Sequence, residues 1–388
     1  MSRLYVTSAA ERRLSRGIQC LEAKDFQELK QTDKEVLLYN KAQQFLGTAY
    51  LSKQNKGVGW FVSKEKITLN KAYFAALFRA ARKKRSFYER SDETTAYRVF
   101  NQDGDFFGGM TVDLYGDYAL FSWYNAFVYT IRQTIVAAFK EVFADKVKGA
   151  YEKVRFDGPA YDSSFVYGER AAEKFLITEN GLKYSVFLDQ GLMTGLFLDQ
   201  REIRRDLTNG LAAGKRLLNL FSYTAAFSLA AASGGAKETV SVDLAKRSKE
   251  LSQAHFAANA IADDSHQFLI MDVFDYLKYA KRKGLLFDII LIDPPSFARN
   301  KKQTFSVHKD YPRLISQSLD ILTEGGLIIA AVNAANMSIS RFQKELEKGF
   351  STRRHTYLSL KQLPDDFAVN QADEKSNYLK VFTIKVEK

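Results

Sequence analysis

An acidic residue and two prolines, Asp293, Pro294 and Pro295, end an apolar stretch, "FDIILIDPPSF" (287–297). Proline lacks an N–H and fixes its φ angle, and the residue before a proline is held extended. The chain therefore cannot turn back into a helix at once, and the three residues form a stiff lip with outward carbonyl groups. Asp293 and the Pro294 carbonyl can accept hydrogen bonds from a planar ring, on which Phe297 can stack. A rigid loop without a ligand is the alternative.

A turn with small residues follows an earlier apolar segment, "KRLLNLF" (215–221). Residues 222–226 lead from it into a helix of small residues, so backbone amides can approach a ligand closely. The turn lacks the GxGxxG pattern of dinucleotide enzymes, which argues against NAD or FAD and favours a cofactor without a pyrophosphate. An ordinary turn capped by Ser or Thr is the alternative interpretation.

Acidic residues end the next two apolar segments. Asp243 stands about 20 positions after the turn, where a carboxylate can accept from both ribose hydroxyls. Asp272 could accept from an adenine amino group, with Val273 and Phe274 packing the ring. Helix capping is an alternative role for Asp243 and does not exclude the first. Together these polar ends predict an adenosine-containing cofactor.

Strands that alternate with helices must position these residues. From residue 181 onward the predicted strands are "KRLLNLF", "TVSVD", "QFLIMD", "DIILID", "GLIIAAV" and "YLKVFTIKV", with helical segments between the first five. This alternation predicts an α/β fold with a doubly wound, mostly parallel sheet. Ligands of such sheets bind beyond the carboxyl ends of the strands.

The first 180 residues have a different pattern of predicted helices and strands. Residues 1–70 contain the short segments "EVLLYN", "FLGTAYL" and "VGWFVS", which predict a small β-rich domain. Residues 71–180 begin with a helical pattern over 71–90, with Phe74, Leu77, Phe78 and Ala81 on one stripe, and continue with antiparallel strands. We therefore predict three domains, at 1–70, 71–180 and 181–388.

Composition limits the class of protein. The chain of 388 residues has a formal net charge of +12, 30 Phe and 20 Tyr, which suits an anionic partner such as nucleic acid. Cys20 is the single cysteine, which excludes an intrachain disulfide and a cysteine-based zinc site, and the four histidines show no metal-ligand spacing. No membrane-spanning run or signal peptide is recognisable, so we expect a cytoplasmic protein without a membrane partner.

Five motifs resemble class I S-adenosylmethionine-dependent methyltransferases, and more closely the bacterial 23S ribosomal RNA large subunit methyltransferase I and K family. They are "GLMTGLFLDQREIR" (191–204), "LLNLFSYTAAFSLAAASGGA" (217–236), "SVD" (241–243), "DPPSFARNKK" (293–302) and "EGGLIIAAVN" (324–333). The resemblance covers nearly the whole chain, although residues 1–70 match only in their pattern of short strand-like segments and not in a motif. It implies a PUA-like RNA-binding domain, an α+β linking domain and a Rossmann-like methyltransferase domain, with large-subunit ribosomal RNA as partner. It is compatible with a homodimer.

The resemblance also implies a set of site residues. S-adenosyl-L-methionine would lie along Asp199, Gln200, Arg201, Asn219, Phe221, Ser222, Tyr223, Thr224, Asp243, Leu244, Asp272, Val273, Phe274 and Asp293. The residues expected at the target base are Asp293, Pro294, Phe297 and Asn333. Those expected to bind RNA phosphates beside it are Arg299, Lys301 and Lys302. Two further basic clusters, at 81–85 and 352–355, are explained equally well as solvated helix faces.

The sequence departs from the family pattern at three places. Alanines 225 and 226 replace frequent glycines, and Met193 replaces a frequent lysine. Members that methylate C5 of cytosine have a cysteine after the fifth strand, whose thiolate adds to the ring. Here that segment is "AAVNAANMS" (330–338), with Asn333 and Asn336 but no cysteine, and it is similar to the branch that methylates N7 of guanine.

A nitrogen target is therefore expected, because nitrogen already has a lone pair and needs positioning rather than a covalent adduct. Three alternatives remain open. They are a non-catalytic RNA-binding assembly factor that retains a cofactor pocket, a cytosine C5 methyltransferase with an unrecognised nucleophile, and a small-molecule or DNA amino methyltransferase.

Overall fold

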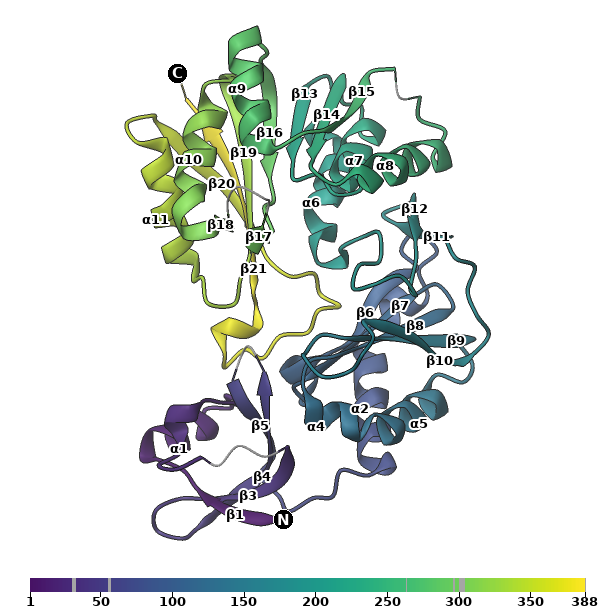
Figure 1. Ribbon diagram of the computed structural model, residues 1–388, viewed down its shortest axis with the longest axis vertical. Coiled ribbons are helices and arrows are strands. Elements are labelled where there is room, and N and C mark those ends of the chain that lie inside the picture. The colour runs from purple at the N-terminus through teal and green to yellow at the C-terminus, as the bar shows by residue number, and fades with distance from the viewer. Residues whose placement is uncertain (30–32, 55–56, 263, 296, 300–303, 388) are drawn as a thin grey trace. The chain divides into compact units, whose positions relative to one another are not determined.

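The chain divides into two compact units (Figure 1). The structure, a computed structural model, describes residues 1–29, 33–54, 57–262, 264–295, 297–299 and 304–387. Unit 1 consists of Met1–Ile177, Phe187–Thr194 and Asp365–Ser376, and unit 2 of Thr178–Val186, Gly195–Pro364 and Asn377–Lys388. The predicted domain boundaries at residues 70 and 180 stay a prediction.

The N-terminal sheet of unit 1 has five strands. Their order is β1 (Ser2–Tyr5), β3 (Lys34–Tyr39), β4 (Phe45–Gln54), β5 (Gly57–Ser63) and β2 (Cys20–Leu21). The prediction of a β-rich segment is confirmed, but it missed helix α1 (Ser8–Ser15). This helix is short and mostly polar, and its only buried residues are Ala10 and Leu14, so its apolar face is limited to a single i, i+4 pair.

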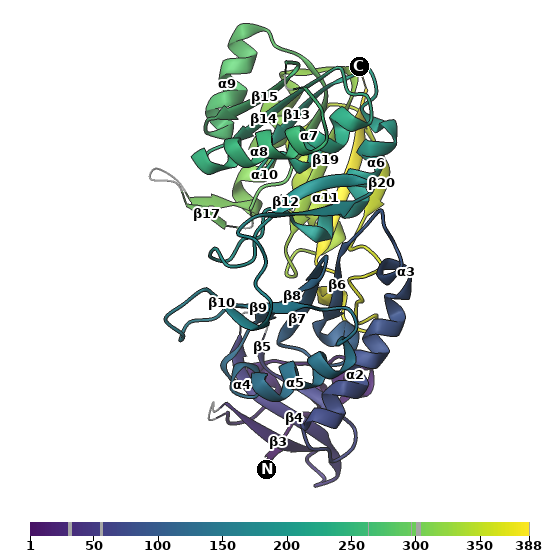
Figure 2. The ribbon, with the colours of Figure 1, turned by 90° about the vertical axis from the view of Figure 1, so that its right-hand side faces the viewer.

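The second sheet of unit 1 packs against three helices. Its strands are, in order, β10 (Ser163–Gly168), β9 (Gly149–Val154), β8 (Tyr118–Trp123), β7 (Met110–Tyr115) and β6 (Ala96–Asn101). The helices of this segment are α2 (Lys71–Lys84), α3 (Ser86–Glu89), α4 (Ala126–Thr130) and α5 (Arg132–Val142), and Figure 2 shows α2, α4 and α5 beside the sheet. The predicted stripe faces this core through Phe74, Phe78 and Ala81.

The helix predicted over 71–90 is interrupted at Arg85. The Arg85 side chain is buried and bonds Asp105 at 2.7 Å (Nη1 to Oδ1) and 2.6 Å (Nη2 to Oδ2). It also donates to the carbonyl of Asp366 at 2.8 Å. Because this long-range network holds the chain at Arg85, α2 ends there and α3 starts anew. Local helix periodicity could not predict that break.

Unit 2 contains the predicted doubly wound sheet. The strand order is β15 (His266–Ile270), β14 (Glu238–Asp243), β13 (Arg216–Leu220), β16 (Phe287–Ile292), β19 (Leu322–Asn333), β21 (Leu379–Val386) and β20 (His355–Lys361). The first five strands are parallel, and β21 is antiparallel to both of its neighbours. The order reverses between β13 and β16, and such a switch point is where open α/β sheets bind ligands.

Helices cover both faces of this sheet (Figure 1). Alternate residues of β13 and β14, such as Leu218 and Val240, enter a core with α9 (Val273–Lys283), α10 (Val307–Leu319) and α11 (Ile339–Phe350). On the other face Asn219 donates to Ser228 of α7 (Ala226–Ser233) at 3.0 Å. Helix α8 (Lys246–Ala258) belongs to the β14–β15 connection, and α6 (Arg201–Asp206) precedes β13.

Two short strand pairs lie outside the three larger sheets. Strands β11 (Phe175–Glu179) and β12 (Leu182–Val186) pair before the sheet of unit 2 begins. Strands β17 (Phe297–Arg299) and β18 (Thr304–Ser306) pair between the Asp-Pro-Pro lip and α10, so the lip does not lead directly into a helix. Within the described ranges, no helix is both long and apolar enough to cross a membrane.

Candidate active site

The turn after β13 is held in an unusual backbone conformation. Phe221, Tyr223 and Ala225 have φ values of 59°, 48° and 56°, although none of them is glycine. Left-handed conformations cost energy in residues with a Cβ, and they persist where tertiary contacts impose them, often at functional sites. Here Tyr223 N donates to Asp243 Oδ2 at 2.9 Å, and Thr224 Oγ1 donates to the Gly195 carbonyl at 2.7 Å.

A narrow cleft lies beside this turn. It encloses about 190 Å³, including the part open to solvent. The lining residues come from the turn, from the ends of β14 and β15, and from α8; they are Ser222, Tyr223, Ser241, Asp243, Ala245, Ser248, Lys249, Ser252, Phe268, Leu269 and Ile270. Asp243 also accepts from Ala245 N at 2.8 Å, so it both lines the cleft and holds the start of the α8 connection.

The other strand-end acid, Asp272, caps a helix. Its Oδ1 accepts from Phe274 N at 2.9 Å and from Asp275 N at 3.3 Å at the start of α9. Val273 is buried, and the Phe274 ring lies 4.5 Å from the Arg313 guanidinium. The adenine-binding role of these residues stays a prediction.

A group of polar side chains meets at the Asp-Pro-Pro lip. Gln200 Nε2 donates to Asp293 Oδ2 at 3.0 Å. Asp199 Oδ2 accepts from Asn333 Nδ2 at 3.3 Å and from the Tyr378 hydroxyl at 3.2 Å. These five residues, which we call the lip cluster, come from the segment before α6, from the position after β16, from the end of β19 and from the position before β21.

The electrostatics of the lip cluster raise the pKa of the Asp293 carboxyl group. Burial, reinforced by the nearby Asp199 carboxylate, raises the pKa of Asp293 to about 7. Arg204 and the hydrogen bond from Gln200 act in the opposite direction but do not cancel this effect. A carboxyl group with a pKa near neutrality can accept a proton and release it again at physiological pH.

Gln200 also presents an open acceptor. Its side chain is buried, and its Oε1 has no hydrogen-bond partner among the residues that the structure describes. A buried carbonyl without a donor is costly, which indicates that a ligand completes the site. The ammonium group of a bound methionine moiety is a donor of the required kind, so the residues present here fit S-adenosylmethionine.

A tyrosine of α10 holds the backbone next to the lip in place. The buried Tyr311 of α10 donates its hydroxyl proton toward the carbonyls of Ile292, at 3.1 Å, and Ala331, at 2.8 Å. It thereby ties the last residue of β16 to β19. Pro294 is buried and Pro295 is exposed, so the lip presents one face outward.

The remaining predicted site residues differ in position. Arg201 is buried, with its Nε 3.5 Å from Glu179 Oε2, and the neighbouring Arg204 bonds Glu179 at 2.6 Å (Nε to Oε1). Asn219 is buried within β13, whereas Leu244 is exposed. Phe297 and Arg299 lie in β17, where the backbone is described, and Lys301 and Lys302 lie outside the described residues. The roles of all these residues stay predictions.

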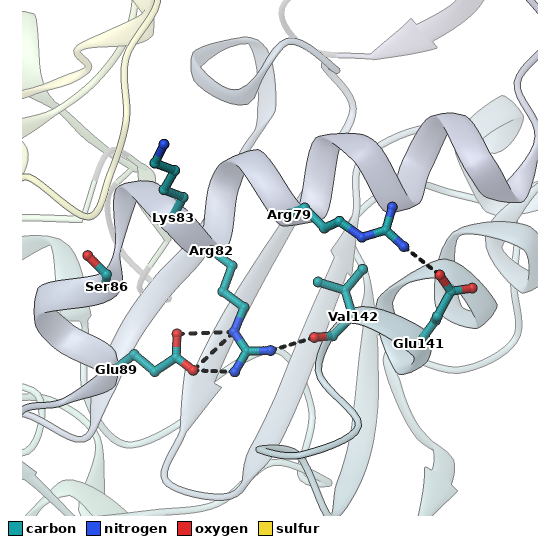
Figure 3. Close-up of a pocket in the computed structure, with 7 residues that line it drawn as sticks. All are labelled: Arg79, Arg82, Lys83, Ser86, Glu89, Glu141 and Val142. Atoms are coloured by element: carbon teal, nitrogen blue, oxygen red, sulfur yellow. Dashed lines mark hydrogen bonds and ion pairs between the residues drawn. The ribbon is translucent and has the colours of Figure 1, made fainter.

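A larger hollow in unit 1 is less suited to chemistry (Figure 3). It encloses about 750 Å³, including open solvent, between α2, α3 and α5. Its arginines are already compensated, because Arg82 bonds Glu89 and the Val142 carbonyl while Arg79 bonds Glu141. Within the described part of the chain, no group of three or more His, Cys, Asp or Glu residues could hold a metal ion.

Sequence reasoning missed Tyr378, Tyr311 and Glu179. Tyr378 lies 179 residues from Asp199, whereas Tyr311 lies 19 residues from Ile292 and Glu179 lies 25 residues from Arg204, and no motif connects any of these pairs. Tyr378 directly precedes β21, for which the sequence predicted a strand but no functional residue.

The doubly wound sheet, the strained turn after its first strand and the lip cluster at the switch point define a class I methyltransferase. Comparison with known proteins agrees. Residues 139–371 match the family model described as S-adenosylmethionine-dependent methyltransferase, and residues 4–64 match a PUA-like domain. The chain belongs to this methyltransferase family, and its cofactor is S-adenosylmethionine, as predicted.

Named relatives cover most of the chain. YwbD of Bacillus subtilis, named as a ribosomal RNA large subunit methyltransferase, is 38% identical over 92% of this chain and 91% of its own length. A ribosomal RNA large subunit methyltransferase of Deinococcus radiodurans is 30% identical over 76% of this chain and 73% of its own. The predicted family resemblance is thus confirmed.

Two solved structures are closely similar. The crystal structure of SMU.776 complexed with SAH is 61% identical, with a TM-score of 0.96 and complete coverage of both chains. A S-adenosylmethionine-dependent methyltransferase from Streptococcus mutans is 60% identical, with a TM-score of 0.95 and the same coverage. These matches confirm the predicted fold class.

Proposed function

We propose that this enzyme methylates a nitrogen of a base in large-subunit ribosomal RNA. The names of its relatives, the PUA-like match and the net charge of +12 support ribosomal RNA as the substrate. A nitrogen target is supported mainly by one observation. The single cysteine, Cys20, is buried in the N-terminal sheet, where it pairs with Trp60 across β2 and β5.

The absence of an accessible thiol is informative because carbon and nitrogen targets require different catalytic groups from the enzyme. Carbon C5 of cytosine becomes nucleophilic only after a nucleophile has added to the ring. A ring or amino nitrogen needs alignment and, if it carries a proton, an acceptor for that proton. The lip cluster offers carboxylate, amide and hydroxyl groups, which suit the second case.

When bound, S-adenosylmethionine supplies an electrophilic methyl group and retains the electron pair of the broken carbon–sulfur bond. The chain's part is to hold the base against the lip, with its target nitrogen aligned. For an amino nitrogen, Asp293 in its ionised form takes the proton that leaves. For a ring nitrogen without a proton, Asp293 and Asn333 only fix the base through hydrogen bonds at its edge.

Nucleoside mass spectrometry tests the proposed function. Purified enzyme, S-adenosylmethionine and unmodified 23S ribosomal RNA should yield one nucleoside with a new N-methyl group, and that nucleoside should be missing from cells without the protein. A product of 5-methylcytidine would contradict the nitrogen target. The absence of any methylated nucleoside would contradict the function itself.

The variant Cys20→Ser separates the two chemistries. We expect it to retain full methyl transfer, and thiol alkylation of the folded enzyme to leave the rate unchanged. Loss of transfer in a variant that still folds and binds S-adenosylhomocysteine would indicate a thiol-dependent mechanism. A homodimer and a cytoplasmic location are also part of the proposal, and sedimentation and cell fractionation test them.

A further inference from the structure

A buried histidine lies behind the turn that follows β13. His255 of α8 is fully buried, and each of its two ring nitrogens faces a backbone carbonyl. Nδ1 lies 3.0 Å from the carbonyl oxygen of Thr224 in the turn, and Nε2 lies 3.1 Å from the carbonyl oxygen of Ser185 in β12. Figure 1 shows α8 beside α7, the helix that begins directly after the turn. One side chain therefore contacts both the turn and β12.

The two carbonyls compete for one proton of the ring. A carbonyl oxygen only accepts hydrogen bonds, so an imidazole can donate to both carbonyls only as the doubly protonated cation. Burial, reinforced by the guanidinium of Arg204, lowers the pKa of His255, although the two backbone contacts act in the opposite direction. The ring of Tyr184 packs edge-on against the imidazole, with centroids 5.4 Å apart, and burial raises its own pKa, so it supplies no negative charge. At neutral pH the histidine therefore donates to one carbonyl.

Strand β12 is attached to α8 independently of this histidine. Asn259, which directly follows α8, accepts from Lys183 N at 2.9 Å and donates to the Lys183 carbonyl at 2.7 Å. The side-chain amide of Asn259 thereby bonds both backbone groups of one strand residue. Because these two hydrogen bonds do not involve His255, β12 stays attached even when the ring donates nothing to Ser185.

The turn depends more strongly on the ring. Thr224 is buried and lies outside any helix or strand, and among the described residues His255 is the hydrogen-bond partner of its carbonyl. The residues on either side, Tyr223 and Ala225, have left-handed φ values of 48° and 56°, which persist only where surrounding contacts impose them. A buried carbonyl that loses its donor is costly, so loss of the ring contact favours a relaxed turn. Tyr223 lines the cleft, which would change with the turn.

We propose that His255 is a positioning residue for the cofactor, whose Nδ1–H donates to the Thr224 carbonyl and keeps the strained turn in the conformation that binds S-adenosylmethionine. The histidine acts through the turn, because Ser248 and Ser252 of the same helix line the cleft whereas His255 reaches the turn from behind. The inference goes beyond the proposed function, since it concerns the cofactor and not the methylated base.

Two conservative variants separate the two contacts. The amide nitrogen of asparagine can take the place of Nδ1, and that of the longer glutamine can take the place of Nε2. His255→Asn therefore keeps a donor for Thr224, and His255→Gln keeps one for Ser185. By calorimetry, we expect the affinity for S-adenosylhomocysteine to stay within about threefold of the wild type in His255→Asn and to fall roughly 5- to 100-fold in His255→Gln.

His266 of β15 offers a matched control. It is also a buried histidine of unit 2, and its Nδ1 lies 2.9 Å from the Thr239 hydroxyl, which can donate or accept. His266→Asn and His266→Gln should both bind S-adenosylhomocysteine within about twofold of the wild type. Thermal unfolding measures the stability of each variant. Because each His255 variant keeps one of the two contacts, we expect similar losses of stability in both, so a difference in affinity cannot come from stability.

The tautomer of the wild-type enzyme can also be observed directly. Proton–nitrogen correlation spectra of isotope-labelled histidine, assigned with the single histidine variants, should show a protonated Nδ1 and an unprotonated Nε2 for His255. Two outcomes would overturn the proposal: a proton on Nε2 alone, or binding of S-adenosylhomocysteine by His255→Gln that equals or exceeds that of His255→Asn. The tautomer decides the case if a variant fails to fold. Neither measurement requires RNA, so failure of the proposed function would leave both results unchanged.

Discussion

The side-chain amide of Gln200 donates a 3.0 Å hydrogen bond to the Asp293 carboxylate. It joins the segment before α6 to the residue that follows β16, so a motif expected at the cofactor directly contacts a residue expected at the target base. The buried Oε1 of the same amide has no partner among the described residues, so it is available as an acceptor for a ligand. Gln200 thus links the residues expected to hold the cofactor to the residue expected to contact the target base.

Replacement of Asp293 by asparagine tests its proposed catalytic role. The variant keeps the shape of the side chain but cannot accept a proton, so we expect methyl transfer to fall at least about 100-fold for an amino target. Binding of S-adenosylhomocysteine, measured by calorimetry, should persist. The exposed Asp320→Asn, which only loses an ion pair with Lys281, is the control and should keep full activity. Full activity of the Asp293 variant would refute the role.

The pH dependence should report the same carboxyl group. The pKa of Asp293 is raised to about 7, and only its ionised form can accept a proton, so kcat/KM for an amino target should rise as the pH increases through about 7. The Asp199 carboxylate contributes to the raised pKa. Asp199→Asn removes that charge, and the midpoint of the profile should therefore move to lower pH.

The pH profile also separates two kinds of target. A ring nitrogen that loses no proton would give a much weaker dependence on the ionisation of Asp293. A midpoint that stays in place in Asp199→Asn would show that Asp199 does not influence the titrating group. Initial rates at subsaturating RNA, measured between pH 5.5 and about 9, resolve these cases.

A buried charge cluster should be important for the stability of unit 2. Glu179 is fully buried and bonds Arg204 at 2.6 Å, while Arg201 lies 3.5 Å away. Glu179→Gln leaves two buried cations without their carboxylate, so we expect the free energy of unfolding to fall by about 3–5 kcal/mol. Urea denaturation measures the change. In Glu238→Gln, where the partner Arg216 is partly exposed, the loss should stay below about 1 kcal/mol.

The Tyr311 hydroxyl should stabilise the lip. Tyr311→Phe leaves two buried carbonyls, of Ile292 and Ala331, without this donor, at an expected cost of about 1–3 kcal/mol in the free energy of unfolding. Thermal unfolding checks the cost. Tyr357→Phe, whose lost partner Glu347 is exposed, is the matched control and should change stability by less than about 1 kcal/mol. Equal effects in both variants would contradict a special role for Tyr311.

Most of the sheet in unit 2 could be predicted because its parallel strands are buried on both faces. Segments such as "DIILID" are then nearly continuous runs of branched apolar residues that alternate with helices. Helix α1 escaped prediction because its exposed side is polar and only Ala10 and Leu14 face the core. The helix break at Arg85 escaped it because the cause, the pair with Asp105 and Asp366, is distant in sequence.

By itself the sequence determined the strands, the polar residues at their ends, the Asp-Pro-Pro lip and the lack of a second cysteine. These are local properties of composition, periodicity and backbone stiffness. Only the tertiary structure brought Asp199, Gln200, Asn333 and Tyr378 to the lip, because the segments that carry them converge there without any fixed spacing along the chain. The raised pKa of Asp293 likewise depends on burial and on a second carboxylate, which exist only once the chain has folded.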